Sequence, residues 1–367
     1  TDLALYFALA RGAETAWYNL APLAMRKWFN TNYHYLIPEI DEPVFKLNPK
    51  PLLELLSEAR AAGLTKPMPT VIGPLTFAAL AECRSDLAST LEALSQAYAD
   101  LVGELKAAGA NLIQFEEPIL CCAPLPFSAE LAQSVYGAID GSSVVLQTYY
   151  DELGEDFTWI SRLPVAGLGL DFVHGSGNLE QLKRHDLPQG KRLVAGVIDG
   201  RNVWPADIER IEALLDELRP WQPILSSSCP LLHVPYTAAG EGNYSFAEEK
   251  LAELAALDRG EPDELERLRQ RRRALIDDAE RHNPQLRQQL ATACREPRGR
   301  LSAHSERARL QQAELKLPLL PTTTIGSFPQ TEAIRRQRRL WRDGQITDSA
   351  YQAHIEKLTA EVVAFQQ

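Results

Sequence analysis

From about residue 30 to residue 230, one pattern recurs along the sequence: a short apolar run that ends in polar residues, followed by an amphipathic stretch. The clearest amphipathic stretch begins at Leu87, where apolar residues recur every three or four positions as far as Leu105, and Gly109 then ends the predicted helix. The runs that fit strands are residues 32–38, 70–77, 111–118, 143–150, 165–174, 192–200 and 223–229. Near-continuous apolar strands that alternate with helices indicate a parallel sheet covered on both faces.

Polar residues collect where these runs end, which is where α/β barrels place their active sites. We predict an α/β fold, a (β/α)8 TIM-type barrel whose first strand lies upstream of the sequence, with an open doubly wound sheet as the alternative. The predicted domains are the barrel over residues 1–243, a long helical linker over 244–320 and the start of a further domain over 321–367. We expect the chain to end inside that further domain.

Charge and composition exclude several classes of partner. The chain has 38 Lys and Arg against 49 Asp and Glu, a net charge of −11, which argues against a general nucleic-acid or anionic-membrane binder. The basic cluster at 266–273 alternates with Asp277, Asp278 and Glu280, so a solvated helix face explains it better than a nucleic-acid patch. No apolar run reaches the roughly 18 residues of a membrane span. Five cysteines, of which Cys121 and Cys122 are adjacent and the others scattered, favour a reducing cytoplasm over a disulfide scaffold.

Motifs for metal binding are weak in this sequence. It has no CxxC and no HExxH, and the nearest arrangement is Cys229 with His233. Two ligands are fewer than the three or four that a zinc site needs, so a buried thiol and a loop histidine are the favoured interpretation.

Glu116 and Glu117 follow a predicted strand, and paired carboxylates can act as general acid and base. Adjacent strand residues point to opposite faces, so we expect one to face the barrel mouth and the other to cap a helix or pair with a base. Other polar residues follow later strands and could either take part in chemistry or tie loops together: Asp171, His174, Asp199, Arg201 and Asn202.

The densest cluster of distinctive side chains is KWFNTNYHY at 27–35. Strand packing explains Phe29 and Tyr33 but not the lysine, the asparagines and the histidine so close together. Rings that stack and an ammonium that pairs with a carboxylate suit an aromatic, anionic ligand. Farther on, TTTIGSFPQT at 322–331 could hold a carboxylate through N–H groups around Gly326, although an ordinary Gly-Ser turn is the alternative.

These segments together resemble the cobalamin-independent methionine synthase family, the 5-methyltetrahydropteroyltriglutamate–homocysteine methyltransferases. The matching strings, in the family's order, are KWFNTNYHYLIPE, VIGPLTF, QFEEPIL, GLGLDFVHG, VIDGRNVW, SSSCPLLH and PTTTIGSFPQT. The resemblance implies two (β/α)8 barrels that arose by duplication. This chain would hold most of the first barrel, the helical linker and the opening of the second, catalytic barrel.

The resemblance also implies the reaction and its site residues. A methyl group would pass from 5-methyltetrahydropteroyltri-L-glutamate to L-homocysteine, with zinc activating the thiol and without cobalamin. Lys27 and Asn32 would bind the folate, and Ile325, Gly326 and Ser327 would bind homocysteine. The zinc ligands would lie downstream, so no catalytic or metal-binding residue is expected in this chain.

The first barrel would then be a copy without metal. Cys229 ends the strand equivalent to one that bears a zinc ligand in the second barrel, but the region LQTYYD at 146–151 lacks the accompanying histidine and cysteine. The chain alone is expected to be inactive, monomeric and cytoplasmic, with small-molecule substrates and no nucleic-acid or membrane partner. The alternatives are a stand-alone folate-binding or scaffold barrel, and a barrel hydrolase that uses Glu116 or Glu117.

Overall fold

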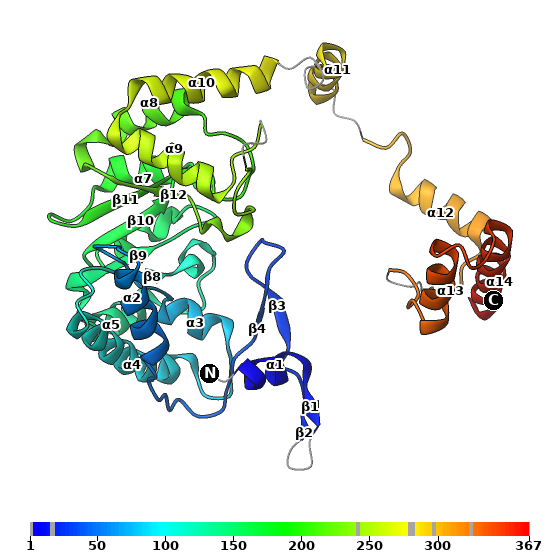
Figure 1. The fold of residues 1–367 in the computed structure, drawn as a ribbon, viewed down its shortest axis with the longest axis horizontal. Coiled ribbons are helices and arrows are strands. Elements are labelled where there is room, and N and C mark those ends of the chain that lie inside the picture. The colour runs from blue at the N-terminus through cyan, green and yellow to red at the C-terminus, as the bar shows by residue number, and fades with distance from the viewer. Residues whose placement is uncertain are drawn as a thin grey trace. The chain divides into compact units, whose positions relative to one another are not determined.

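The computed structural model describes residues 3–14, 19–239, 243–277, 283–295, 299–322 and 326–366, and divides the chain into two compact units, 1–283 and 284–367. A six-stranded sheet, all of whose pairs are parallel, forms the centre of the first unit (Figure 1). Its strands, in spatial order, are β6 Thr70–Ile72, β8 Ile113–Glu116, β9 Val144–Gln147, β10 Gly167–Asp171, β11 Arg192–Ile198 and β12 Ile224–Ser227.

The spatial order of these strands is the same as their order along the chain, as expected when each crossover connects neighbouring parallel strands. The predicted α/β fold with a parallel sheet is therefore confirmed. In the described part of the chain β6 and β12 are the two edges of the sheet, so closure into an eight-stranded barrel stays a prediction.

Helices follow the strands, as the amphipathic stretches predict. They are α2 Lys50–Ala61, α3 Pro74–Leu80, α4 Leu87–Ala107, α5 Ala129–Gly137, α6 Phe157–Ile160, α7 Asn178–His185 and α8 Ile208–Leu218. Helix α4 begins after Asp86, whose carboxylate accepts a hydrogen bond from the Ser89 amide, and ends just before Gly109, which has a φ of +87°. The predicted start and end of this helix are confirmed.

The two faces of the sheet differ in character, because side chains alternate between them along each strand. One face packs on the helices and carries side chains that are at most 1% exposed: Ile113, Phe115, Val144, Leu146, Leu168, Leu170, Leu193 and Ala195. The other face carries small or polar residues toward the carboxyl ends of the strands: Glu116, Gln147, Gly169, Asp171 and Gly196. The apolar character of the runs therefore comes mainly from the helix-covered face.

Two predicted strands differ from the structure. Within 32–38 only β4, His34–Leu36, is extended, and it pairs antiparallel with β3, Met25–Lys27, instead of joining the parallel sheet (Figure 1). A partner only a few residues away costs little loop-closure entropy, and this segment lacks the continuous apolar run of a buried strand. The strand predicted at 70–77 ends at Ile72, because Gly73 and Pro74 begin α3.

Smaller elements complete the N-terminal part of this unit. They are α1 Leu3–Arg11, the antiparallel pair β1 Ala13–Glu14 and β2 Asn19–Leu20, and the parallel pair β5 Glu39–Ile40 and β7 Glu82–Cys83.

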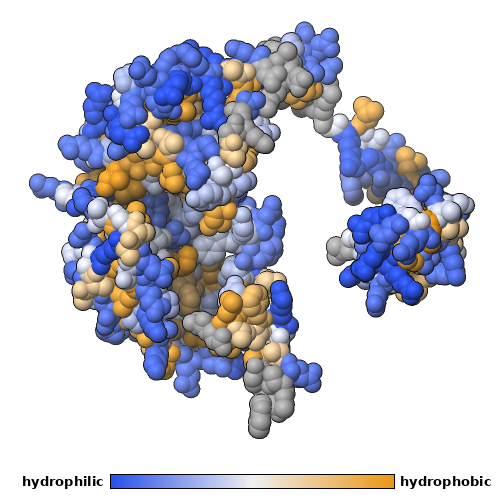
Figure 2. Space-filling view, in the orientation of Figure 1, coloured by the Kyte–Doolittle hydropathy of each residue, from blue (hydrophilic) through white to orange (hydrophobic). Residues whose placement is uncertain are grey.

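Helices α9, Ala247–Arg259, and α10, Pro262–Asp277, belong to the first unit and contact β12 and α8 respectively. The basic cluster predicted as a solvated face lies on α10, where Arg269 pairs with Glu212 of α8. The surface over α8 and α10 is mostly hydrophilic in Figure 2. Part of the cluster thus joins two helices by ion pairs. Asp278 and Glu280, which the prediction also used, lie outside the described residues.

The second unit is described by itself. It contains α11 Pro284–Arg295, α12 His304–Leu315, α13 Glu332–Arg342 and α14 Asp348–Gln366. Helices α13 and α14 are joined by Trp341, whose ring stacks on that of Tyr351 with centroids 4.8 Å apart. The domain boundaries 1–243, 244–320 and 321–367 stay predictions. Among the described helices of the whole chain, none is long and apolar enough to cross a membrane.

Candidate functional site

The carboxyl ends of the parallel strands bring the predicted polar residues to one edge of the sheet. Glu116 ends β8, Asp171 ends β10, Asp199 follows β11 and Cys229 follows β12. Two tyrosines that sequence reasoning did not single out, Tyr149 and Tyr150, follow β9 at the same edge. They come directly after a buried run, and that position is the signal that could have identified them.

Glu117 is fully buried and binds the start of α3. Its carboxylate accepts hydrogen bonds from the Leu75 amide at 2.9 Å, the Thr76 amide at 2.6 Å and the Tyr136 hydroxyl at 2.7 Å. Burial raises the pKa of Glu117 to about 7, although these hydrogen bonds lower it. The expectation that one of the paired glutamates caps a helix is therefore confirmed, and Glu117 has a structural role.

Glu116 points to the other face and accepts a hydrogen bond from the Tyr149 hydroxyl at 3.0 Å. Burial raises the pKa of its carboxyl group, because removal from water penalises the charged form. The two adjacent glutamates therefore do not converge on one substrate, which removes the geometric basis for the hydrolase alternative.

Asp171 has no exposed surface and ties the strand-end loops together. Its carboxylate accepts hydrogen bonds from the Tyr150 amide at 3.1 Å and from the Val173 and His174 amides at 2.8 Å each. It also lies 3.3 Å from His174 Nδ1, and this hydrogen bond raises the pKa of His174. Between the two interpretations of Asp171 and His174, the geometry favours tying loops.

Tyr150 is held in an uncommon backbone conformation with a φ of +82°. For a bulky residue this conformation is strained, and it persists only where the surroundings impose it. The Tyr150 hydroxyl shares a hydrogen bond of 2.7 Å with His233 Nε2, and the Arg201 guanidinium lies 5.0 Å above its ring centroid. Tyr150 thereby joins three of the loops at the sheet edge.

The segment that connects β3 and β4, residues 28–33, is called here the mouth turn, and it lies against this edge. Phe29, at a φ of +49°, packs its ring 6.1 Å from that of Tyr150. Asn30 accepts hydrogen bonds from Arg201, and the Tyr33 hydroxyl donates to the Leu232 carbonyl at 2.7 Å. A cavity of about 230 Å³ lies beneath the turn, between it and the cysteines and tyrosines that follow β8 and β9.

The predicted folate residues lie beside the mouth turn. Lys27 ends β3, directly before the turn, and is paired in register with His34 of β4. Asn32 lies within the turn itself, and the side chains of both Lys27 and Asn32 are exposed. Within the described residues, no hydrogen bond or ion pair of the Lys27 ammonium is found, so this cation is available to a ligand. The folate roles of Lys27 and Asn32 stay predictions.

Cys229 and His233, the nearest arrangement to a metal motif in the sequence, each contact other side chains. Cys229 is 3% exposed and packs against Tyr149 and Tyr150, and burial raises the pKa of its thiol to about 12. His233 is occupied by its hydrogen bond to Tyr150. Across the part of the chain that the structure describes, no group of three or more His, Cys, Asp or Glu side chains could hold a metal ion. These residues therefore do not fit the zinc ion that the resemblance implies.

The predicted homocysteine residues belong to the second unit. Ile325 lies outside the described residues. Gly326 has a φ of +80°, which favours glycine, and Ser327 is exposed shortly before α13. The homocysteine roles of these residues stay predictions.

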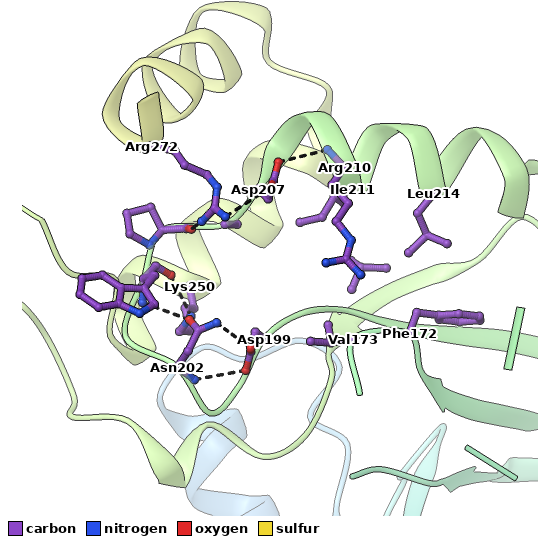
Figure 3. A pocket seen from close by; sticks show the side chains of 14 residues that line it. Phe172, Val173, Asp199, Asn202, Asp207, Arg210, Ile211, Leu214, Lys250 and Arg272 are labelled. Carbon is purple, nitrogen blue, oxygen red and sulfur yellow. Dashed lines mark hydrogen bonds and ion pairs between the residues drawn. The ribbon is translucent and has the colours of Figure 1, made fainter. Parts of the chain in front are cut away.

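Polar side chains from the loop itself and from α9 brace the loop that follows β11 (Figure 3). Asp199 accepts hydrogen bonds from the Asn202 side chain at 2.6 Å and from the Arg201 amide at 2.8 Å. Lys250 of α9, only 2% exposed, donates to Asn202 Oδ1 and to the Trp204 carbonyl, at 3.3 Å each. Sequence reasoning missed Lys250, because it lies in the segment predicted as linker.

Comparisons with known proteins bear on both units. The family description "Cobalamin-independent synthase, N-terminal domain" matches residues 1–222, and "Cobalamin-independent synthase, Catalytic domain" matches residues 320–367. The curated 5-methyltetrahydropteroyltriglutamate–homocysteine methyltransferases of Bacillus cytotoxicus and Bacillus cereus are each 36% identical over 391 residues, covering 100% of this chain and 51% of theirs. The chain thus spans about half the length of the curated relatives it matches.

Solved structures are more distant. A B12-independent methionine synthase from Shewanella sp. W3-18-1 has a TM-score of 0.46 and 16% identity, and the match covers 62% of this chain and 72% of that one. A methyltransferase from Methanosarcina mazei has a TM-score of 0.43 and 17% identity, with coverages of 57% and 63%. The family assignment depends on the sequence matches: the N-terminal description alone covers more than half of the residues. The chain belongs to the cobalamin-independent methionine synthase family.

Proposed function

We propose that the protein containing this chain transfers a methyl group from 5-methyltetrahydropteroyltri-L-glutamate to L-homocysteine, giving methionine. The observation that carries this proposal is the match of the whole chain, at 36% identity, to enzymes of that name. The two family descriptions, matched in order along one chain, support it. As its family name states, the reaction proceeds without cobalamin.

Within this reaction, residues 1–283 bind and orient the folate. Lys27, whose side chain is exposed, directly precedes the packed rings of Trp28 and Phe29, and a cation next to aromatic residues suits a substrate that combines an aromatic ring system with carboxylates. Asn32 supplies a further donor and acceptor in the same turn. In this proposal a zinc ion would activate the homocysteine thiol, and its ligands would come from outside the described residues.

Homocysteine binds near Ile325, Gly326 and Ser327 in this proposal. A left-handed glycine leaves neighbouring N–H groups free to approach a carboxylate, and the serine hydroxyl adds a donor. The proposal also includes the domain boundaries predicted above, a monomeric state and a cytoplasmic location.

The test is a methyl-transfer assay on the whole protein encoded by the native gene, without cobalamin. Lys27→Ala should raise the KM for the folate about tenfold and leave the KM for homocysteine unchanged, since a charge-assisted hydrogen bond contributes on the order of 1.5–3 kcal/mol and 1.4 kcal/mol is tenfold. Lys66→Ala, at another exposed lysine of the same unit, is the matched control and should change neither constant.

The outcomes test the role of Lys27 and the enzyme proposal separately. An unchanged folate KM in Lys27→Ala would remove the folate role of that lysine. A whole protein that binds the folate but transfers no methyl group would overturn the enzyme proposal in favour of a stand-alone folate-binding barrel.

A further inference from the structure

We propose that Arg201 is a positioning residue for folate binding. Its guanidinium fixes the mouth turn, residues 28–33, against the carboxyl edge of the sheet, and thereby fixes the Lys27 ammonium that precedes the turn. The last step, that Lys27 serves folate binding, rests on the proposed function, whereas the clamp itself rests on contacts alone.

The first contact is a two-pronged grip on one residue of the turn. Arg201 Nη1 donates to the side-chain oxygen of Asn30 at 2.9 Å, and Nη2 donates to the main-chain carbonyl of Asn30 at 3.1 Å. The planar guanidinium holds two donors at a fixed spacing, which a lysine ammonium does not reproduce. The grip therefore constrains both the position of the turn and the orientation of its main chain.

The second contact joins the same guanidinium to a strand end. Arg201 Cζ lies 5.0 Å from the ring centroid of Tyr150, within the range of a cation–π interaction, and Phe29 of the turn packs on the same ring. Tyr150 is itself fixed by its hydrogen bonds to Asp171 and His233. The turn therefore meets a surface whose parts are already held in place.

The loop that carries Arg201 is held by hydrogen bonds within the loop and to α9, and Figure 3 shows Asp199, Asn202 and Lys250 of this network. The Arg201 amide donates to Asp199, and the neighbouring Asn202 is held by Asp199 and by the buried ammonium of Lys250. The mouth turn, by contrast, connects two strands of three residues each, and Asn30, Asn32 and Tyr33 within it are exposed. We therefore infer that Arg201 is held in place by its own loop and that the turn is held in place by Arg201.

Displacement of the turn would also move Lys27, which directly precedes it. The amide of Trp28, the next residue, donates to the Tyr33 carbonyl at 2.7 Å and closes the turn onto the end of β3. The tie from the Tyr33 hydroxyl to Leu232 would remain without Arg201. Loss of Arg201 should therefore loosen the turn without unfolding the unit.

The experiment uses the whole protein with Arg201→Ala, Arg201→Lys and Asn30→Ala. The control is Arg184→Ala, which removes an exposed arginine of α7. In Arg201→Ala the KM for the folate should rise about tenfold, while kcat and the KM for homocysteine change less than about twofold. Arg201→Lys should restore only part of this loss, because it keeps the charge but not the fork.

A second readout is independent of activity: the rate of tryptic cleavage after Arg26 and Lys27, followed by mass spectrometry. Cleavage there requires local opening of the hairpin, so Arg201→Ala should accelerate it several-fold, and Arg184→Ala should not. Asn30→Ala changes an exposed turn residue and should also accelerate cleavage, by a smaller factor. This variant tests the clamp if Arg201→Ala folds poorly. Adding Arg201→Ala to Asn30→Ala should accelerate cleavage by less than the product of the two single effects.

The two readouts separate the clamp from the reaction. Faster cleavage in Arg201→Ala supports the clamp even in a protein that fails the methyl-transfer assay. Unchanged cleavage in the folded Arg201→Ala and Asn30→Ala variants overturns it. Faster cleavage with an unchanged folate KM, in an active enzyme, overturns the positioning role.

Discussion

Glu117 lies where the end of a strand, the first turn of a helix and a buried tyrosine hydroxyl meet. Its hydrogen-bond donors come from α3 and α5, which are far from it along the chain. A pair of adjacent glutamates in the sequence is therefore compatible with acid–base chemistry and with helix capping. Strand alternation predicts that the two side chains diverge, but the donors that distinguish Glu117 from Glu116 come from tertiary packing.

The raised pKa of Glu117 predicts a pH dependence of stability. Its carboxyl group has a pKa of about 7 in the folded state, against 4.5 for a glutamate in water, so the folded state binds more protons between these pH values. The free energy of unfolding should therefore fall as pH rises through that window, and the contribution of Glu117 should amount to about 3 kcal/mol at most.

The measurement is urea unfolding of the wild type and Glu117→Gln between pH 4.5 and pH 7. Because glutamine does not titrate, the wild type should lose stability relative to the variant as pH rises. The exposed Glu104→Gln should show no such trend relative to the wild type. If the difference in free energy of unfolding between wild type and Glu117→Gln does not change with pH, the raised pKa of Glu117 is contradicted.

At the scale of elements, the β6–α3 junction shows how one missing side chain permits a buried contact. A Cβ at Gly73 would lie 2.3 Å from the carboxyl carbon of Glu117. Gly73 has a φ of −73°, so space and not backbone conformation requires glycine here. Gly103, inside α4, has no atom within 4 Å of an added Cβ.

These two glycines give a matched prediction. Gly73→Ala should destabilise the protein by about 1–3 kcal/mol, because the added methyl group forces the Glu117 carboxylate away from the start of α3. Gly103→Ala should stabilise it by about 0.5–1 kcal/mol, since glycine is disfavoured within a helix. Midpoints of urea unfolding would test both. Equal effects of the two substitutions would contradict the steric role of Gly73.

Elements with strong periodicity could be predicted from the sequence. Elements whose pairing partner depends on competition between alternative segments could not. Helix α4 has an apolar stripe, an N-cap aspartate and a terminal glycine that all agree, so its bounds follow from local chemistry. The strand expected at 32–38 becomes half of a hairpin, because the preceding segment offers a nearby partner. The Lys250 brace comes from a helix whose sequence carries no sign of what it packs against.

At the scale of the molecule, the alternation of apolar runs and helices is sufficient to predict a sheet of parallel strands in chain order. It is not sufficient to identify the ligand. The residues of the mouth turn stand out in the sequence as an unusual cluster, but the proposal that this region binds folate comes from the family resemblance. Physical reasoning on the sequence could not place Asn30 against Arg201, because 171 residues separate them and only the fold brings them together.

The division into two units predicts that the first folds without the second. All side chains described as buried lie before residue 284, and α12, α13 and α14 contain none. Since burial of apolar surface is the main source of stability, a chain of residues 1–283 should unfold cooperatively, with a Tm within a few degrees of that of residues 1–367. Residues 284–367 alone should show no cooperative transition, because isolated short helices are marginal in water. Calorimetry of the three chains is the measurement. A large loss of Tm in the shortened first chain would show that the described core depends on contacts beyond residue 283.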